Sequence, residues 1–103
     1  MAKIKLAADP TFTAMVSIPI PGAKPTPVEF TFKHRTKKDV AEWGNALADK
    51  PDVDLIKDMA SGWELDDEFN DANIAMLCQN YAGAAFAIFE TYLEELRGAR
   101  AKN

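Results

Sequence analysis

The sequence has few of the residues from which catalytic and metal sites are built. It contains one cysteine, Cys78, and one histidine, His34. A lone cysteine excludes an intrachain disulfide framework and fits a reducing compartment. His34 has no cysteine, serine or second histidine close to it in sequence, so neither a zinc site nor a catalytic triad is indicated. We therefore expect a protein that is not an enzyme and that needs no metal or cofactor.

Glycine-rich and long apolar segments are also absent. The five glycines are scattered, so the chain has no loop of the kind that cradles phosphate. No apolar run approaches the ~20 residues that span a bilayer, and the first ten residues lack the apolar segment of a signal peptide. These observations predict a cytoplasmic protein that does not bind membrane.

The charge is modest and unevenly distributed. A net charge of −4 over 103 residues argues against nucleic acid as a partner. Residues 1–48 carry a net +3, whereas residues 49–103 carry −7. Copies of the chain can therefore meet head to tail in a homo-oligomer, although solvated faces of opposite sign explain the same asymmetry.

The apolar pattern predicts one domain over residues 1–103 with an α+β fold, in which an N-terminal β-hairpin packs on a bundle of three or four helices. Residues 1–11 are expected to form a flexible arm, residues 12–35 the hairpin and residues 36–103 the helices. In the second strand, Val28, Phe30 and Phe32 alternate with polar residues and should share one buried face.

Three helical segments are expected, at about 36–49, 51–60 and 70–97. Thr36 with an acidic residue three positions later resembles a capping box, which marks the start of the first segment. Gly83 lies inside the third segment and is expected either to kink it or to divide it into two helices.

The final helix carries a wider apolar face than a single core requires. Its apolar positions span roughly 160° of the helix circumference. We interpret Phe86, Phe89, Tyr92 and Leu93 as candidate contacts with another protein chain, because aromatic residues are enriched at such contacts. The alternative is that the hairpin and the other helices cover the whole face.

Two further charged stretches are candidate sites. Lys37 and Lys38 fall in the first turn of a predicted helix, where the helix dipole disfavours positive charge, so an acidic protein surface is a candidate partner. The alternative, which the sequence favours, is a solvated charged turn. The acidic run from Glu64 to Asp71 has part of the spacing of a calcium loop, but Asp71 stands where the turn glycine is required.

Several short features follow one another along the chain: Pro10-Thr11-Phe12, the strand from Val28 to Thr36, Gly62-Trp63, Asp67-Glu68-Phe69 with Asn73, and a helix with Tyr81 and Tyr92-Leu93 that ends in Ala99-Arg100 and Asn103. In this order they resemble the tail assembly chaperones of long-tailed bacteriophages over nearly the whole chain.

The resemblance implies a non-catalytic protein that binds the tape measure protein, a long and largely helical chain that sets tail length, and keeps it soluble before the tail tube forms around it. It also implies self-association, a location in the host cytoplasm and absence from the mature virion. In many of these phages a ribosomal frameshift adds a second domain that recruits tail tube protein, and a chain ending at Asn103 would be the unextended form. The alternative function is a small cytoplasmic adaptor or regulatory domain that binds another bacterial protein.

Overall fold

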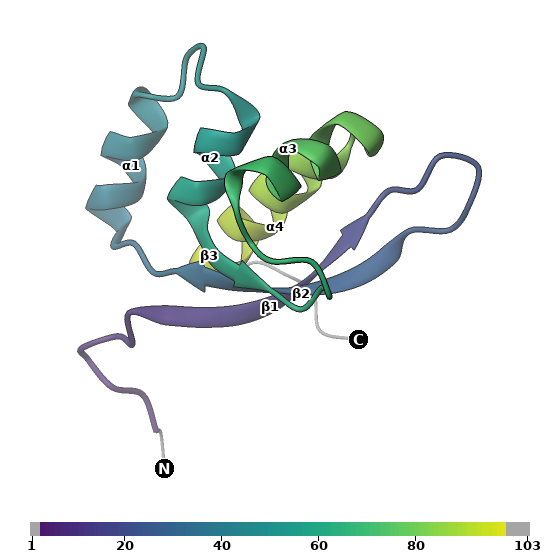
Figure 1. The fold of residues 1–103 in the computed structure, drawn as a ribbon. Coiled ribbons are helices and arrows are strands. Elements are labelled where there is room, and N and C mark those ends of the chain that lie inside the picture. The colour runs from purple at the N-terminus through teal and green to yellow at the C-terminus, as the bar shows by residue number, and fades with distance from the viewer. Residues whose placement is uncertain (1–2, 99–103) are drawn as a thin grey trace.

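A computed structural model describes residues 3–98. Its elements, in chain order, are β1 (Thr11–Ile18), β2 (Thr26–Lys33), α1 (Lys37–Asn45), α2 (Asp52–Met59), β3 (Ala60–Trp63), α3 (Asp71–Asn80) and α4 (Ala84–Arg97). The strands form an antiparallel sheet in the order β1-β2-β3, and the helices lie on one side of it (Figure 1). The predicted α+β fold with an N-terminal hairpin is confirmed. The first two residues of the predicted arm and the C-terminal motif at 99–103 lie outside the described residues.

The hairpin buries one face because its apolar residues alternate. Val28, Phe30 and Phe32 are all buried, as the alternation predicts, and Val16 and Ile18 of β1 join them in the core. Residues of β1 that alternate with the buried ones, such as Thr13 and Ser17, face away from the helices and are exposed. The sheet therefore supplies one wall of the core and leaves its other face open to solvent.

Strand β3 is a correction to the prediction that residues 36–103 are helical. It has only four residues, Ala60–Trp63, and pairs with β2, with a register irregularity at Thr31 and Phe32. Its sequence has no period-two pattern and includes Gly62, a residue that strands disfavour. The pairing comes from tertiary contact with a strand about thirty residues earlier, which local sequence does not encode.

Helix α1 begins where the sequence predicts and ends earlier. The Thr36 side chain accepts a hydrogen bond of 3.1 Å from the backbone N–H of Asp39, which satisfies one free donor of the first turn. The helix ends at Asn45, before the predicted end at Asp49. Asp49 has a φ of 62°, which is incompatible with a continuing right-handed helix and is a conformation that aspartate tolerates.

The third helical segment is divided at Gly83, which is one of the two outcomes expected from the sequence. The Asn70 side chain caps the start of α3 by accepting from the backbone N–H of Asn73, at 2.9 Å. Gly83 then separates α3 from α4 and lies against the hairpin. A Cβ atom at Gly83 would lie 3.1 Å from Cγ of Pro19, so only glycine permits this approach without adjustment. Gly98, with a φ of 65°, ends α4.

Aromatic rings form the centre of the core. Tyr92 of α4 lies beside Phe32 of β2 and Trp43 of α1, with ring centroids 5.3 and 5.6 Å apart, and Phe12 stacks on Tyr92 at 6.3 Å. Burial of such a side chain stabilises a fold by about 1.5–3 kcal/mol. The cluster joins β1, β2, α1 and α4, so these elements fix the position of α4 and of the surface on its other side.

Candidate protein-binding surfaces

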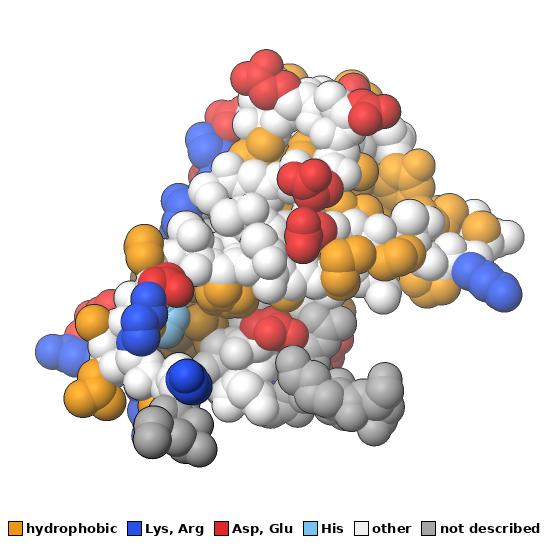
Figure 2. Space-filling view, turned by 90° about the horizontal axis from the view of Figure 1, so that it is seen from below, with side chains coloured by type: hydrophobic (Ala, Val, Ile, Leu, Met, Phe, Trp, Pro, Cys, Tyr) orange, Lys and Arg blue, Asp and Glu red, His pale blue; other side chains and the backbone are white. Residues whose placement is uncertain are grey.

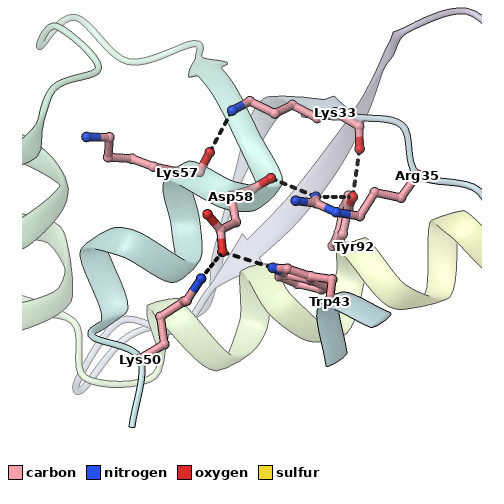
Figure 3. A network of polar contacts seen from close by, with 7 residues as sticks. All are labelled: Lys33, Arg35, Trp43, Lys50, Lys57, Asp58 and Tyr92. Carbon is pink, nitrogen blue, oxygen red and sulfur yellow. Dashed lines mark hydrogen bonds and ion pairs between the residues drawn. The ribbon is translucent and has the colours of Figure 1, made fainter. Parts of the chain in front are cut away.

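A network of polar side chains lies beside the aromatic cluster (Figure 3). Asp58 of α2 accepts hydrogen bonds on Oδ2 from Trp43 Nε1 at 2.9 Å and from Lys50 Nζ at 2.6 Å. Arg35 donates to the backbone carbonyl of Asp58 at 2.7 Å and to the Tyr92 hydroxyl at 2.9 Å. The guanidinium also lies 4.7 Å from the centre of a Trp43 ring, a cation–π distance. The network therefore joins the end of β2 to α1, α2 and α4.

The state of Asp58 indicates a structural role for this network. Partial burial alone would raise the pKa of Asp58, but the hydrogen bonds from Lys50 and Trp43 and the nearby positive charges outweigh it and hold the pKa below its ordinary value. A carboxylate that stays ionised and already accepts two hydrogen bonds is poorly suited to act as a general acid. We conclude that these residues hold the helices in place.

Helix α4 presents a small apolar hollow of about 230 Å³ on its outer side. Three of the predicted contact residues line it, and Phe86 is 66% exposed. Phe89 packs against Trp43 at 6.0 Å, so only part of its ring faces outward. The lining residues are Phe86, Phe89, Leu93, Glu90, Glu94 and Arg97. Aliphatic and aromatic surface bordered by charges is typical of a protein contact site.

Tyr92 does not belong to this surface, and its interpretation as a contact residue is corrected. Its side chain is 0% exposed, and its hydroxyl donates a 2.7 Å hydrogen bond to the backbone carbonyl of Lys33. Phe89 and Tyr92 are three residues apart and look alike in sequence. The difference arises because Tyr92 faces the sheet, where a buried polar acceptor is available for its hydroxyl.

Lys37 and Lys38 are both exposed in the first turn of α1, as the sequence predicts. The hollow on α4 does not include either lysine, so the structure does not bring the two candidate sites together. His34 is also exposed, at the end of the hairpin.

A larger groove, of about 420 Å³, lies between the end of the hairpin and α3 and was not predicted. Met76 of α3 is 58% exposed at its rim. Apolar side chains from the hairpin, β3, the following loop and α3 line it, among them Ile18, Val28, Trp63, Leu65, Met76 and Tyr81. Met76 lies off the buried stripe of α3, and Leu65 is an apolar residue within an acidic loop. Both were visible in the sequence as apolar residues that no predicted core required.

The acidic loop after β3 borders this groove. Asp67 lines it, and its backbone carbonyl accepts a 2.8 Å hydrogen bond from Trp63 Nε1. The backbone carbonyl of Glu68 accepts from the Asn73 side chain at 2.7 Å. Within residues 3–98, no group of three or more His, Cys, Asp or Glu side chains is placed to hold a metal ion. In the same range no helix has the length and apolarity to cross a membrane.

Comparison with known proteins identifies the family to which the chain belongs. A sequence model described as phage tail assembly chaperone matches residues 1–103. The chain belongs to the phage tail assembly chaperone family, as its resemblance to these proteins predicts. No curated protein and no solved structure gives a significant match to the chain.

Proposed function

We propose that this chaperone binds the tape measure protein through the hollow on α4 and keeps it soluble in the host cytoplasm during tail assembly, without catalysis. The same proposal includes self-association, release before the virion is complete, and recruitment of tail tube protein by a frameshift-extended form. The observation that supports client binding most directly is the exposure of Phe86 beside Phe89 and Leu93.

The shape of the hollow suits a helical client. Phe86, Phe89 and Leu93 follow steps of three and four residues, so they form a row along one side of α4. An amphipathic helix that lies along such a row buries its own apolar side chains between them. The tape measure protein, as a long and largely helical chain, offers many segments of that kind.

The charges around the hollow favour particular segments. Glu90 and Glu94 lie on its border one helical turn apart, and Arg97 follows. A client helix with basic residues beside its apolar stripe would meet the two carboxylates. Such rim contacts contribute more to partner selection and association rate than to affinity.

Co-expression with the tape measure protein tests the proposal. The wild-type chaperone should keep the client in the soluble fraction and purify with it. Phe86→Asp places a charge in the hollow at an exposed site, so it should leave the fold intact and lower the soluble client several-fold. Ala82→Asp is the matched control, because Ala82 is exposed, lies just before α4 and does not line the hollow.

Two results would contradict the proposal. If the wild-type protein leaves the tape measure protein insoluble and instead captures a different host protein, the adaptor function is the better interpretation. If Phe86→Asp maintains client solubility as well as Ala82→Asp does, the hollow on α4 is not the client site. Circular dichroism of both variants checks that each is folded.

A further inference from the structure

We infer that the groove between the hairpin and α3 receives the N-terminal arm, residues 3–10, of a second copy of the chain. The inference gives a site to the self-association included in the proposed function and rests on that part of it. It does not depend on the identity of the client or on the hollow of α4.

The arm carries two large apolar side chains with no cover in the monomer. Ile4 is 82% exposed and Leu6 is fully exposed. Lys3 and Lys5 alternate with them. In an extended segment, alternate residues point to opposite sides, so the two apolar side chains share one edge and the two lysines the other. The arm is therefore suited to an apolar groove with acidic surroundings.

The groove has both apolar walls and acidic surroundings. Its apolar walls come from hairpin residues such as Ile18 and from Met76 of α3, and its volume of about 420 Å³ can take aliphatic side chains. Asp67 lines the groove, and the loop that contains it also carries Glu64, Asp66 and Glu68. In Figure 2 acidic side chains lie next to hydrophobic ones in the middle and upper part of the face, while most basic side chains lie toward the left.

The positive charge of Lys5 can be redirected from its partner within the arm to the acidic loop of a second copy. Lys5 pairs with Asp9 at 2.5 Å, and both side chains are 68% exposed. An exposed pair four residues apart adds little stability, so exchanging it for contacts with the acidic loop costs little. The uneven charge of the chain, positive in its first half and negative in its second, also favours contact between the basic arm of one copy and the acidic loop of another.

The arm of the same chain is poorly placed to fill the groove, because Leu6 falls short of its far end. The arm joins β1 at Thr11, whereas the groove lies at the other end of the hairpin, where Ile18 pairs with Thr26. Thr11 and Ile18 are separated by roughly 23 Å along the strand. Leu6 precedes Thr11 by five residues and extends at most about 18 Å from it. The arm of a second copy is not restricted by this attachment and can place both Ile4 and Leu6 along the groove.

An arm in a neighbour's groove is a head-to-tail contact. Each copy has one arm and one groove, so the two surfaces of the contact differ. A contact of this type can be reciprocated in a two-fold pair, can close into a ring or can continue as an open helical assembly. Because the two surfaces of the contact differ, mixing a variant with a defective arm and a variant with a defective groove can restore one contact.

The first test measures self-association of the full-length protein by sedimentation and light scattering over a concentration series. Leu6→Asp in the arm and Met76→Glu at the groove rim should each raise the dissociation constant at least about tenfold, as expected for loss of one buried apolar side chain. Thr13→Asp and Gln79→Glu add the same charge at exposed positions outside the arm and outside the groove lining, and both variants should stay close to wild type.

The second test mixes the two variants. Leu6→Asp keeps an intact groove and Met76→Glu keeps an intact arm, so an equimolar mixture should form one wild-type contact and give a heterodimer that does not grow further.

A mixture that stays monomeric while wild-type chains associate would overturn the inference, as would variants that associate like the wild type. A wild-type protein that stays monomeric yet keeps its client soluble would overturn the inference and leave client binding standing. Loss of client solubility by Leu6→Asp with unchanged self-association would assign the arm to the client and also overturn it.

Discussion

The Tyr92 hydroxyl of α4 donates a hydrogen bond of 2.7 Å to the backbone carbonyl of Lys33, at the end of β2. The same hydroxyl accepts from Arg35 at 2.9 Å. These bonds join the last helix to the strand at the point where the chain leaves the sheet for α1. They hold α4 so that its apolar inner side meets the sheet while Phe86 faces outward.

Replacement of Tyr92 by phenylalanine should destabilise the protein by about 1–2 kcal/mol, because the ring stays packed while Lys33 and Arg35 each lose a hydrogen-bond partner. Urea unfolding followed by tryptophan fluorescence measures the change. Tyr81→Phe is the matched control, since it removes the hydroxyl of the other tyrosine, which lies half-buried at the end of α3. Equal stability of the two variants would show that the hydroxyl of Tyr92 does not hold α4 in place.

Asp58 should make the stability of the protein depend on pH in the acidic range. Its pKa lies below the ordinary 3.8 in the folded state, since hydrogen bonds from Lys50 and Trp43 overcome the effect of partial burial. A lowered folded pKa means that this contribution is fully present above about pH 4 and is lost as the pH falls through the folded pKa.

Asp58→Asn tests this dependence. At pH 7 the variant should be less stable by about 1–3 kcal/mol, because its side chain cannot form the ion pair with Lys50. The difference between the variant and the wild type should shrink as the pH falls below the ordinary pKa of 3.8 and the wild-type carboxylate becomes protonated. A difference that stays constant over that range would show that the Asp58 charge does not contribute.

Local signals predicted much of the fold. The capping side chains of Thr36 and Asn70 begin α1 and α3 where the sequence places them, since a cap bonds to residues two or three positions away. Alternation in β2 identified Phe30 and Phe32 as core residues. These features depend only on neighbours in the chain.

Features that depend on distant residues were not predictable in the same way. Strand β3 exists because β2 lies beside it, and its own four residues carry no strand pattern. Phe86 and Tyr92 both belong to the apolar pattern of the last helix, but the packing of the sheet and α1 covers only Tyr92. The groove arises from the separation between the hairpin and α3, which no single segment determines.

Cys78 should react slowly with alkylating reagents. Burial raises the pKa of its thiol, and the charge of Asp52 adds to the effect, so less of the reactive thiolate is present at a given pH. At pH 8 iodoacetamide should modify the native protein several-fold more slowly than the protein unfolded in guanidinium. A native rate equal to the unfolded rate would show that the thiol is accessible and unshifted.

The contact between Gly83 and Pro19 predicts that the effect of Gly83→Ala on stability depends on the residue at position 19. Replacing glycine by alanine where the backbone permits it stabilises a protein by about 0.4–1 kcal/mol, since the unfolded chain loses freedom. Gly83 has a φ of −87°, which alanine accepts, but its Cβ would lie 3.1 Å from Cγ of Pro19. A proline ring is rigid, so the crowding should outweigh the gain and make Gly83→Ala destabilising by about 1 kcal/mol.

Removing the proline ring at position 19 should reverse the effect of Gly83→Ala on stability. In a Pro19→Ala background Cγ is absent, so Gly83→Ala should become neutral or stabilising, and the two substitutions should couple by about 1 kcal/mol in a double-mutant cycle of unfolding free energies. Gly44→Ala provides the control. Gly44 lies inside α1, and a Cβ there would meet nothing within 4 Å, so alanine should stabilise the helix by about 1 kcal/mol in both backgrounds. Additive effects of Gly83→Ala and Pro19→Ala would mean that the turn before α4 does not press on the hairpin.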